Sequence, residues 1–531
     1  MYSGKELWKG IIPFQLEEVR VSDHRVIETY PDLPVNLYAS LVQTADRLPD
    51  KLAVSDDCGH TATFSELLDK ADRFAAYLKS EVGVKRGDRI AVMLYNSLEF
   101  GVAFLAISKL GAVAIPFQTK YREVEIHSLL SKAEPAIVLT DPYYEQWFAP
   151  CREAGKPVVV CGDIHSGYGF EGMEADPALA PENEGRMTDD ALMVFTSGTT
   201  SQSKGVVIKN FNIMHAIVSY QITLRMTEDD IAVIPVPMYL ITGLIALFGL
   251  FVRIGGTVYI QQFFDADAVL SCVRDHHVTF VHASPTVFSL LLEKADSYPE
   301  LPSLTKFACG SSNMPKEKIR QLYRWVPQSA FHTVYGLTET TSPGTIFPVG
   351  AATSPYIGSS GIPIPGMNYR IVREDGTDAD PGEVGTVMLN GANLLDSYYQ
   401  MDTPLLKDNW LDSGDLGYAN EAGYLFIVDR KKDMINRGGE KITSFDVENE
   451  IYQIEGVVDA AVVGIPDEKY GEVPVAVVKT KPDFKLTADE MRAYLKTRLA
   501  SYQVPAIIRF MDEIPVTPNG KVNKKYIRTL F

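Results

Sequence analysis

Residues Thr196–Gly205 read TSGTTSQSKG and directly follow the apolar run Ala191–Phe195. A buried strand is therefore predicted to end in a loop of hydroxyl groups, two glycines and one lysine. Glycines let backbone N–H groups approach an anion, hydroxyls donate hydrogen bonds, and the lysine adds a positive charge. The stretch is typical of a phosphate-binding loop, with a flexible surface loop as the structural alternative. It is not a Walker loop, because Lys204 lies between Ser203 and Gly205.

Apolar segments alternate with amphipathic segments on both sides of this loop. Before it, Thr63-x-x-Glu66 forms a capping-box pattern at the start of a helix. The other elements expected before the loop are strands at 89–94, 112–117 and 135–140 and helices at 99–110 and 122–132. Those expected after it are helices at 210–224, 243–253, 267–276, 286–294 and 316–325, and strands at 230–236, 257–260, 279–283, 304–309 and 330–335. Strands that are apolar throughout are buried on both faces, so the alternation predicts layered α/β subdomains.

The composition changes twice towards the C-terminal end. Residues 358–415 form short segments separated by Pro and Gly, which is typical of β-hairpins in a smaller β-rich subdomain. A charged run at 429–433 follows, and then come two helical and two strand patterns within about a hundred residues, enough to fold separately. We therefore predict an α/β N-terminal domain at 1–431 and a separate α+β domain at 432–531.

The bulk properties exclude several classes of protein. A length of 531 residues favours about three or four structural units. The net charge of −18 argues against nucleic-acid binding, which requires basic surfaces. Five scattered cysteines without C-x-x-C spacing indicate neither a disulfide framework nor a cysteine zinc site. The first residues lack a secretory signal and the apolar run 240–252 is too short for a membrane span, so we expect a cytoplasmic protein without stable membrane insertion.

Four further polar motifs lie where the fold alone does not require them. YGLTET (335–340) ends an apolar strand, SGD (413–415) places a carboxylate in a turn, Asp429-Arg430 precedes the second domain, and PNGK (518–521) presents a lysine on a tight turn. Taken singly, each also fits a structural role, such as an Asx turn or a solvated ion pair. Their combination is more specific than any one of them.

In this order and at these separations, the motifs resemble those of the adenylate-forming (ANL) superfamily, which includes acyl-CoA synthetases, peptide-synthetase adenylation domains and beetle luciferases. The resemblance extends from about Asn36 to Lys525 and includes GVKRGDRIAVMLYNS (83–97), GIPDEKYGE (464–472) and LASYQVP (499–505). It implies a large N-terminal adenylation (AMP-binding) domain and a mobile C-terminal lid. It also implies two reactions: a carboxylate attacks the α-phosphate of ATP to give an acyl-adenylate and pyrophosphate, and a thiol, usually that of coenzyme A, then displaces AMP.

The resemblance also assigns residues to ATP and Mg²⁺. The residues expected at the β- and γ-phosphates are Thr196, Ser197, Gly198, Thr199, Thr200 and Lys204. Glu339 is expected to bind Mg²⁺ and Thr338 to contact the α-phosphate. Tyr335 is expected to stack on adenine, while Asp415 and Arg430 bind the ribose hydroxyls. The residues expected beside the nucleotide are Gly310, Ser311, Ser312 and Gly336.

The C-terminal domain is expected to serve both reactions. Lys521 matches the lysine that this family brings in to contact both the carboxylate and the α-phosphate. One preorganised cation there is worth about 3–4 kcal/mol, or several hundred-fold in rate. Lys432 matches the residue about which the lid rotates, with a solvated linker lysine as the structural alternative. Tyr470 matches an aromatic position near the nucleotide of coenzyme A, or is a packing tyrosine. The residues expected in the pantetheine tunnel are Arg437, Gly438 and Gly439.

Two departures from the family pattern bear on function. The phosphate loop usually ends in Thr-Gly-x-Pro-Lys-Gly, and here Ser201 and Ser203 replace the Gly and the Pro. Leu240 stands where many relatives carry a histidine in the acyl tunnel, which favours a more apolar acyl pocket. The apolar strand around His282 favours a core histidine with satisfied hydrogen bonds over a substrate contact. The expected acyl-pocket residues are Tyr239, Leu240, His282, Gly310, Gly336 and Pro343.

The resulting hypothesis is an ATP-dependent carboxylate–CoA ligase for an aromatic or medium-to-long aliphatic acid, with ATP, Mg²⁺ and coenzyme A as cofactors. One alternative keeps the adenylation but transfers the acyl group to a carrier protein or to oxygen. Another is a non-catalytic binding protein of the same fold. The set that argues against this last alternative is Lys204, Glu339, Asp415, Arg430 and Lys521. Whether the protein forms a homodimer stays open.

Overall fold

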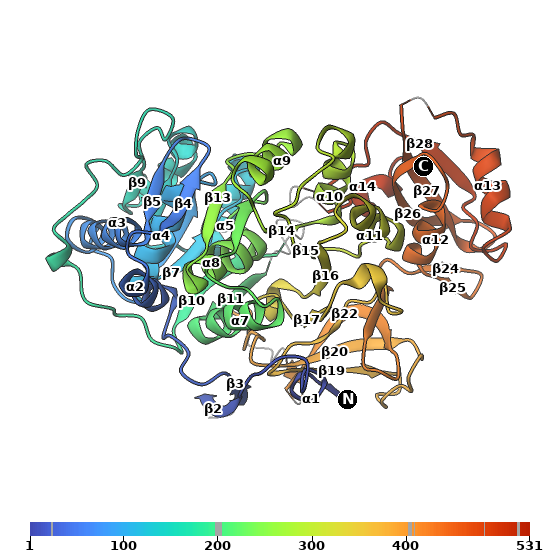
Figure 1. Ribbon diagram of the computed structural model, residues 1–531, viewed down its shortest axis with the longest axis horizontal. Coiled ribbons are helices and arrows are strands. Elements are labelled where there is room, and N and C mark those ends of the chain that lie inside the picture. Colours follow the sequence, from blue (N-terminus) through green and yellow to red (C-terminus); the bar gives the residue numbers. More distant parts are fainter. Residues whose placement is uncertain (23–24, 197–203, 402–405, 408, 483, 518–520) are drawn as a thin grey trace.

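The structure is a computed structural model that describes residues 1–531 except 23–24, 197–203, 402–405, 408, 483 and 518–520. Figure 1 shows a body built on two large sheets, a small β-rich subdomain beside it, and a C-terminal domain at the other end. This is the α/β architecture that the sequence predicts, with layered subdomains, a β-rich subdomain and a separate α+β C-terminal domain.

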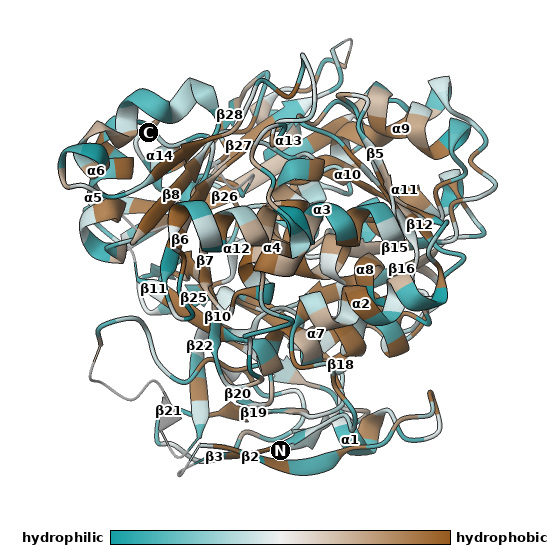
Figure 2. Ribbon diagram, turned by 90° about the vertical axis from the view of Figure 1, so that its left-hand side faces the viewer, coloured by the Kyte–Doolittle hydropathy of each residue, from teal (hydrophilic) through white to brown (hydrophobic). Residues whose placement is uncertain are grey.

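The first large sheet has the strand order β11-β10-β7-β6-β8-β9. Its strands are β6 (Arg89–Met93), β7 (Val113–Pro116), β8 (Ile137–Thr140), β9 (Val158–Val160), β10 (Asp190–Phe195) and β11 (Gly205–Lys209). All pair in parallel except β11, which runs antiparallel to β10 and places Phe195 opposite Gly205. The phosphate loop predicted from the sequence is therefore the connection of a hairpin, and β11 is a strand that the sequence patterns did not predict. In Figure 2 the strands β6, β7 and β8 are hydrophobic, as expected for a sheet covered on both faces.

The second large sheet has the order β18-β17-β16-β15-β14-β12-β13-β4-β5. Its strands are β4 (Leu52–Asp56), β5 (Thr61–Thr63), β12 (Ile231–Ile234), β13 (Thr257–Ile260), β14 (Phe280–Ala283), β15 (Lys306–Cys309), β16 (Ala330–Tyr335), β17 (Thr345–Ile346) and β18 (Ile362–Pro363). The predicted strands from β12 to β16 are all present and parallel. β4 completes the sheet by pairing Val54 with Val258, from a distant part of the chain.

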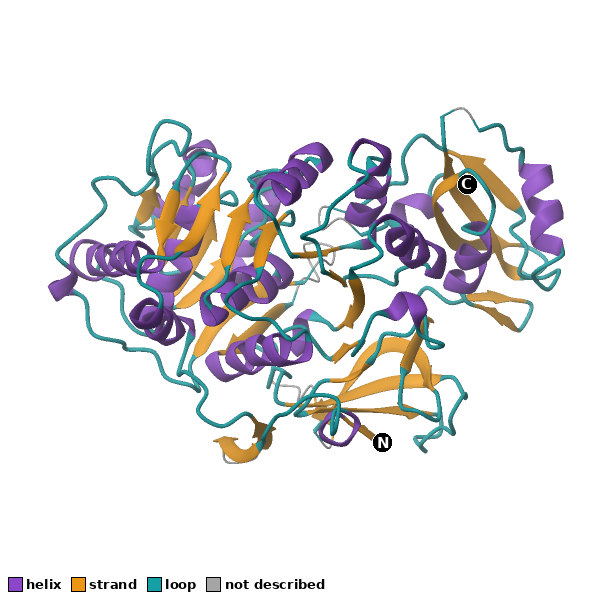
Figure 3. Ribbon diagram, viewed as in Figure 1, coloured by secondary structure: helices purple, strands orange, loops and turns teal. Residues whose placement is uncertain are grey.

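Helices cover the faces of both sheets (Figure 3). The longer ones in the body are α2 (Leu37–Arg47), α3 (Phe64–Tyr77), α4 (Leu98–Lys109), α5 (Glu123–Ala133), α7 (Asn210–Thr223), α9 (Ala266–Asp275), α10 (Pro285–Leu292) and α11 (Lys316–Trp325). The predicted capping box at the start of α3 is formed by Thr63 and Glu66. The predicted buried helix at 243–253 is also present, as a π-helix, η4 (Thr242–Gly249), that continues into α8 (Leu250–Ile254).

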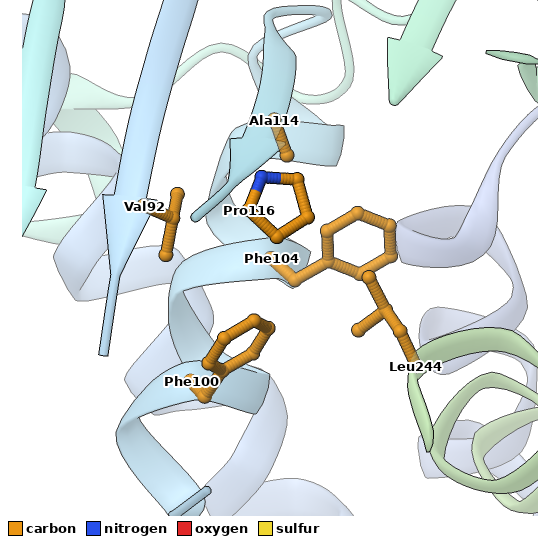
Figure 4. Close-up of a pocket in the computed structure, with 6 residues that line it drawn as sticks. All are labelled: Val92, Phe100, Phe104, Ala114, Pro116 and Leu244. Atoms are coloured by element: carbon orange, nitrogen blue, oxygen red, sulfur yellow. The ribbon is translucent and has the colours of Figure 1, made fainter. Parts of the chain in front are cut away.

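Helix α4 lies between the two sheets. All its residues are buried, and it contacts β7 of the first sheet and β4 of the second. Gly101 of α4 faces Phe248 of η4 so closely that a Cβ atom there would lie 2.6 Å from the Phe248 ring. Figure 4 shows Phe100 and Phe104 of α4 meeting strand residues and Leu244 of η4 in an apolar crevice. The crevice has no room for a water molecule, so it belongs to the core rather than to a ligand site.

The remaining elements form the β-rich subdomain and the C-terminal domain. The β-rich sheet contains β1 (Tyr2–Ser3), β19 (Met367–Val372), β20 (Gly385–Gly391), β21 (Leu406–Lys407), β22 (Trp410–Ala419) and β23 (Leu425–Arg430), with β2 (Glu17–Ser22) and β3 (Arg25–Thr29) as a separate hairpin. The C-terminal sheet contains β24 (Ile435–Arg437), β25 (Glu440–Ile442), β26 (Val457–Asp467), β27 (Gly471–Thr480) and β28 (Ile507–Phe510). The helices that accompany it are α12 (Ser444–Ile451), α13 (Ala488–Lys496) and α14 (Lys524–Arg528). The predicted boundary between residues 431 and 432 falls between β23 and β24 and stays a prediction. Within the described ranges, no helix combines the length and apolar character needed to cross a membrane.

Candidate active site

Three parallel strands of the second sheet end side by side. β14, β15 and β16 are neighbours in register, with Ala283 opposite Cys309 and Cys309 opposite Thr333. Ligands of open α/β sheets bind at the carboxyl ends of such strands. The residues that the sequence analysis assigned to the nucleotide here are Gly310, Ser311, Ser312, Tyr335 and Gly336, and the structure brings them to this one edge. Both serines are exposed, whereas Gly310 is buried and a Cβ on it would lie 3.2 Å from the Val334 carbonyl oxygen.

Asp415 joins this edge from the β-rich subdomain. It is 3% exposed, and its Oδ2 accepts a hydrogen bond of 2.8 Å from the Tyr335 hydroxyl. Its Oδ1 lies 3.3 Å from Nε of Arg430, which stands opposite it on β23. Burial raises the pKa of the Asp415 carboxyl, against the opposing effects of Arg430, Tyr335 and Lys521. The carboxylate is therefore held between an aromatic hydroxyl and a guanidinium, with polar partners already in place.

Glu339 and Lys204 share a partner that the sequence analysis missed. The Tyr398 hydroxyl donates a 2.8 Å hydrogen bond to Oε1 of Glu339, which follows Thr338 in the short helix η6 (Thr338–Thr340). The Lys204 ammonium lies 4.7 Å from the centre of the Tyr398 ring. A single carboxylate suits Mg²⁺, which keeps water and phosphate oxygens as its other ligands. Tyr398 therefore positions both the expected Mg²⁺ ligand and the expected phosphate-binding lysine. In the sequence, the adjacent tyrosines Tyr398 and Tyr399 are the local feature that could have indicated this contact.

The phosphate loop is described at its two ends only. The Thr196 backbone N–H donates a 3.1 Å hydrogen bond to the Lys204 carbonyl, which closes the base of the loop. The predicted phosphate contacts Ser197, Gly198, Thr199 and Thr200 lie outside the described residues, as do Ser201 and Ser203, which depart from the family pattern.

Lys521 reaches this group from the C-terminal domain. Its backbone N–H donates to the Thr517 hydroxyl at 3.3 Å, and its carbonyl accepts from the Thr517 N–H at 2.6 Å, so Thr517 and Lys521 lie next to each other. Burial lowers the pKa of the Lys521 ammonium; Arg430 lowers it further, while Asp415 and Glu339 raise it. Lys432 also lies close enough to lower this pKa. The Lys521 ammonium is therefore close enough to the charged groups of the body to interact with them.

Two of the expected acyl-pocket residues, His282 and Gly310, lie close together at the carboxyl ends of β14 and β15. His282 is buried, and a Cβ on Gly310 would lie 3.6 Å from its Nε2. The prediction that its hydrogen bonds are satisfied is wrong, because Nδ1 has no partner among the described residues. Burial lowers the pKa of His282 to about 3, so the ring is neutral at pH 7. The Tyr220 ring centre lies 5.8 Å from that of His282, and the Tyr220 hydroxyl is 2.9 Å from Oγ of Ser342, next to Pro343.

Tyr239 and Leu240 precede η4. Tyr239 is buried in the main core and burial raises the pKa of its hydroxyl to about 12, while Leu240 packs against the same core with part of its surface exposed.

The residues expected to meet coenzyme A cluster on the C-terminal domain. Arg437 donates a 2.8 Å hydrogen bond to the Tyr502 carbonyl, and its guanidinium lies 4.7 Å from the centre of the Tyr470 ring. The Gly438 N–H donates to the Tyr470 carbonyl at 2.7 Å, and Gly438 and Gly439 have φ of 62° and 95°, which suits glycine. Tyr470 is 38% exposed, so it is a surface tyrosine with a stacked guanidinium rather than a core residue.

A buried lysine connects the body to the C-terminal domain. Lys318 of α11 is 5% exposed, and its ammonium lies 3.5 Å from Oδ1 of Asp459 and 4.8 Å from the centre of the Tyr452 ring, both on the C-terminal domain. Lys318 also donates to the Ser289 hydroxyl of the body. Burial lowers the pKa of Lys318, and Asp459 opposes that effect. The sequence analysis did not single out this contact.

Comparisons with known proteins agree with this geometry. Residues 41–399 match the family model described as AMP-binding enzyme, and residues 446–521 match that of the AMP-binding enzyme C-terminal domain. A feruloyl-CoA synthase from Amycolatopsis is 31% identical over 89% of this chain and 94% of its own length. A 2-succinylbenzoate–CoA ligase from Bacillus subtilis is 32% identical over 92% of this chain and 97% of its own length.

Solved structures show the same overall fold. The ATP-bound structure of MatB from Rhodopseudomonas palustris superposes with a TM-score of 0.82 at 27% identity, covering 93% of this chain and 98% of that one. The O-succinylbenzoate coenzyme A synthetase (MenE) of Bacillus subtilis, in complex with ATP and a magnesium ion, gives a TM-score of 0.79 at 29% identity, covering 92% of this chain and 98% of that one. The chain therefore belongs to the AMP-binding enzyme family within the adenylate-forming (ANL) superfamily, and it is an AMP-forming acid–thiol ligase that uses ATP, Mg²⁺ and coenzyme A.

Proposed function

We propose that this ligase converts an aromatic or medium-to-long aliphatic monocarboxylic acid into its coenzyme A thioester. The observation that carries the proposal is the Lys521 ammonium, which lies near Glu339 and Asp415 of the body while its own pKa is lowered by burial and by Arg430. A cation held in a partly desolvated position stabilises charge that develops between a carboxylate and a phosphate. Relatives named for aromatic acids, such as the feruloyl-CoA synthase, support the choice of substrate class.

In the first reaction, a carboxylate oxygen of the acid bonds to the α-phosphorus of ATP. The bond from that phosphorus to the oxygen shared with the β-phosphate breaks, and pyrophosphate leaves. Lys521 contacts the carboxylate and the α-phosphate, with Thr338 donating a further hydrogen bond. Thr196 and Lys204 contact the β- and γ-phosphates, and Glu339 binds the Mg²⁺ that neutralises them. No side chain has to transfer a proton, because the acid reacts as its carboxylate.

The adenosine lies along the strand ends of the second sheet. Tyr335 stacks on adenine beside Gly336 and the segment Gly310–Ser312. Asp415 accepts from both ribose hydroxyls, and Arg430 donates to them. This role is supported by the burial of Asp415 and its 2.8 Å hydrogen bond from Tyr335. Because burial raises the pKa of Tyr335 far above its usual range, its hydroxyl remains a donor.

In the second reaction, the C-terminal domain (432–531) rotates about Lys432 so that a thiol replaces Lys521 at the acyl carbonyl. Lys432 is exposed and lies between β23 and β24, which belong to different sheets, so a dihedral change there disturbs neither sheet. The thiol loses its proton to water, its sulfur bonds to the acyl carbon, and AMP leaves with the former carboxylate oxygen. The residues proposed to receive coenzyme A are Arg437, Gly438, Gly439 and Tyr470.

The acyl pocket that we propose carries no positive charge. Its members are Tyr239, Leu240, His282, Gly310, Gly336 and Pro343. Burial keeps His282 neutral at pH 7, and Leu240 adds apolar surface in place of a polar side chain. A second carboxylate on the substrate would therefore meet no cationic partner among these residues. The unpartnered Nδ1 of His282 instead suits a neutral polar group, such as the hydroxyl of a phenolic acid.

A pyrophosphate-release screen over a panel of carboxylic acids, with and without coenzyme A, tests this function. We expect monocarboxylic aromatic or longer aliphatic acids to be turned over and matched dicarboxylic acids to be poor substrates. Adenylate formation without turnover on free coenzyme A would indicate a carrier-protein acceptor instead. The five unpaired cysteines fit a reducing compartment, and we propose a cytoplasmic location.

A further inference from the structure

Three polar side chains come from β4, from the turn between β4 and β5, and from α4, which lie in the body at the end away from the C-terminal domain (Figure 1). Asp56 ends β4, His60 lies in the turn before β5, and Glu99 lies in the first turn of α4. One ligand atom from each lies within 4.8 Å of the other two. Glu99 is 0% exposed and Asp56 is 7% exposed. A histidine nitrogen with two carboxylates is a donor set typical of divalent transition metals.

Two buried polar atoms of this trio lack a hydrogen-bond partner among the described residues. Glu99 Oε1 accepts a hydrogen bond of 2.9 Å from the Gly169 backbone N–H, but Oε2 accepts none. His60 Nδ1 lies 3.2 Å from Glu99 Oε1 and 3.5 Å from Asp56 Oδ2, yet it makes a hydrogen bond with neither. Buried polar atoms of native proteins are almost always satisfied. Close approach without a hydrogen bond is the geometry expected of ligand atoms that share one ion.

The trio is held in place before any ion binds. Asp56 Oδ1 accepts hydrogen bonds from the backbone N–H groups of Cys58 (3.1 Å) and His60 (2.8 Å). Its Oδ2 accepts from the Leu98 N–H at 3.1 Å. A carboxylate has about four lone-pair positions, so Oδ2 keeps one for a metal ion. These bonds attach the turn between β4 and β5 to the start of α4, which gives the preorganisation that metal sites require.

The surroundings of the trio are strongly acidic. The residues lining a nearby hollow of about 300 Å³ include Asp141, Asp163 and His165. Nδ1 of His165 lies 3.8 Å from Sγ of Cys58, in the turn between Asp56 and His60. Burial raises the pKa of Asp141, and the nearby Asp163 and Glu99 raise it further. A group of neighbouring carboxylates such as this one attracts a cation.

We propose that Asp56, His60 and Glu99 bind one divalent transition metal ion of the Zn²⁺ type, which ties the turn between β4 and β5 to α4. The imidazole ligand and the small number of oxygen ligands favour such an ion over Mg²⁺ or Ca²⁺, which prefer oxygen donors alone. Water completes the coordination. The role is structural, because none of the three residues is among those proposed to contact ATP, the acid or coenzyme A.

Calorimetric titration of the full-length, chelator-treated protein with Zn²⁺, and separately with Mg²⁺, tests the site without any substrate. We expect one equivalent of Zn²⁺ to bind and to raise the melting temperature, and Mg²⁺ to do neither. His60→Gln and Glu99→Gln should each weaken Zn²⁺ binding by about 100-fold or more, since a ligand is lost in each. Glu99→Gln keeps an oxygen that can accept from the Gly169 N–H, so it removes the charged ligand with little effect on the contact between α4 and the Gly169 segment. X-ray absorption of the Zn²⁺-loaded wild type should show one imidazole nitrogen and oxygen ligands at about 2.0–2.2 Å, which needs no variant to fold.

His165→Gln is the matched control, because it removes a histidine from the adjacent hollow and leaves the trio intact. Its Zn²⁺ affinity should equal that of the wild type. A larger loss in His165→Gln than in His60→Gln would overturn the assignment of the trio. Absence of Zn²⁺ binding by the wild type would also overturn the proposal. Neither result bears on acid activation, which the pyrophosphate screen measures separately.

Discussion

The contact between Lys318 and Asp459 is expected to shift the equilibrium of the C-terminal domain between the closed arrangement, which serves adenylation, and the rotated arrangement, which serves thioester formation. The two charges are 3.5 Å apart, and Lys318 is only 5% exposed. At an effective dielectric constant of about 20 their attraction is about 5 kcal/mol, most of which offsets the cost of removing both charges from water. We take about 1.5 kcal/mol as the net contribution, which corresponds to about tenfold in the equilibrium between the closed and the rotated domain.

Asp459→Asn removes the charge but keeps Oδ1, which accepts hydrogen bonds from the Tyr452 hydroxyl and the Ala460 N–H. We expect the rate of adenylation, measured as single-turnover pyrophosphate release, to fall by about tenfold. Thioester formation from a supplied acyl-adenylate should be unchanged or faster, because the rotated state no longer competes with the buried ion pair. Lys441→Met is the matched control, since it removes an exposed ion pair with Glu374 that joins the same two domains at 3.3 Å. The control should change either rate by less than about twofold.

Two results would refute this reasoning. If Asp459→Asn slowed both half-reactions equally and lowered the melting temperature, the pair would stabilise the fold rather than the closed state. If Asp459→Asn behaved like Lys441→Met, burial of Lys318 would have no bearing on closure.

Three further predictions address the active site. Lys521→Ala should slow adenylation by several hundred-fold, about 3–4 kcal/mol, and leave thioester formation from a supplied acyl-adenylate within a few-fold; equal loss in both assays would contradict the two-state domain. Tyr398→Phe removes the hydroxyl that donates to Glu339, and it should lower kcat/KM for MgATP by about tenfold, or 1.5 kcal/mol, whereas Tyr399→Phe should not. The folded state holds the pKa of His282 at about 3, below the 6.5 of an exposed histidine, so the unfolded chain binds an extra proton between these values. Stability should therefore fall as pH drops from 7 to 5, by about 1.4 kcal/mol per pH unit for this residue once the pH is well below 6.5. In thermal melts, His282→Asn should show a smaller loss of melting temperature over that range; an unchanged loss would show that other groups dominate.

Local sequence patterns predicted a helix or strand correctly where its formation depends mainly on its own residues. Helix α11 (Lys316–Trp325) and strand β16 (Ala330–Tyr335) have the predicted bounds. The capping box of Thr63 and Glu66 is formed, because both partners lie within one turn. The sequence Thr443-x-x-Asp446 before α12 resembles a capping box but makes no such cap, since the Thr443 hydroxyl donates to the Asp446 carboxylate instead.

Elements that depend on distant partners were not predicted. β4 joins the second sheet by pairing with β13, about two hundred residues away, and no local periodicity reveals such a partner. β11 turns the phosphate loop into a hairpin because Gly205 pairs with Phe195. The π-helical form of η4 was not predicted either. Residues 243–249 are all buried, so the form of this apolar segment depends on the elements packed around it.

The sequence by itself determined the layered α/β class and the presence of a C-terminal domain, and it indicated Glu339, Asp415 and Lys521 as candidate site residues. Each of these features depends on local composition or on a short motif. Only the tertiary structure decided which residues meet: Tyr398 between Glu339 and Lys204, Lys318 beneath Asp459, and the buried trio of Asp56, His60 and Glu99. The physical reason is that hydrogen bonding, desolvation and charge interaction depend on distances of a few ångströms between residues far apart in the chain. Sequence spacing does not contain those distances.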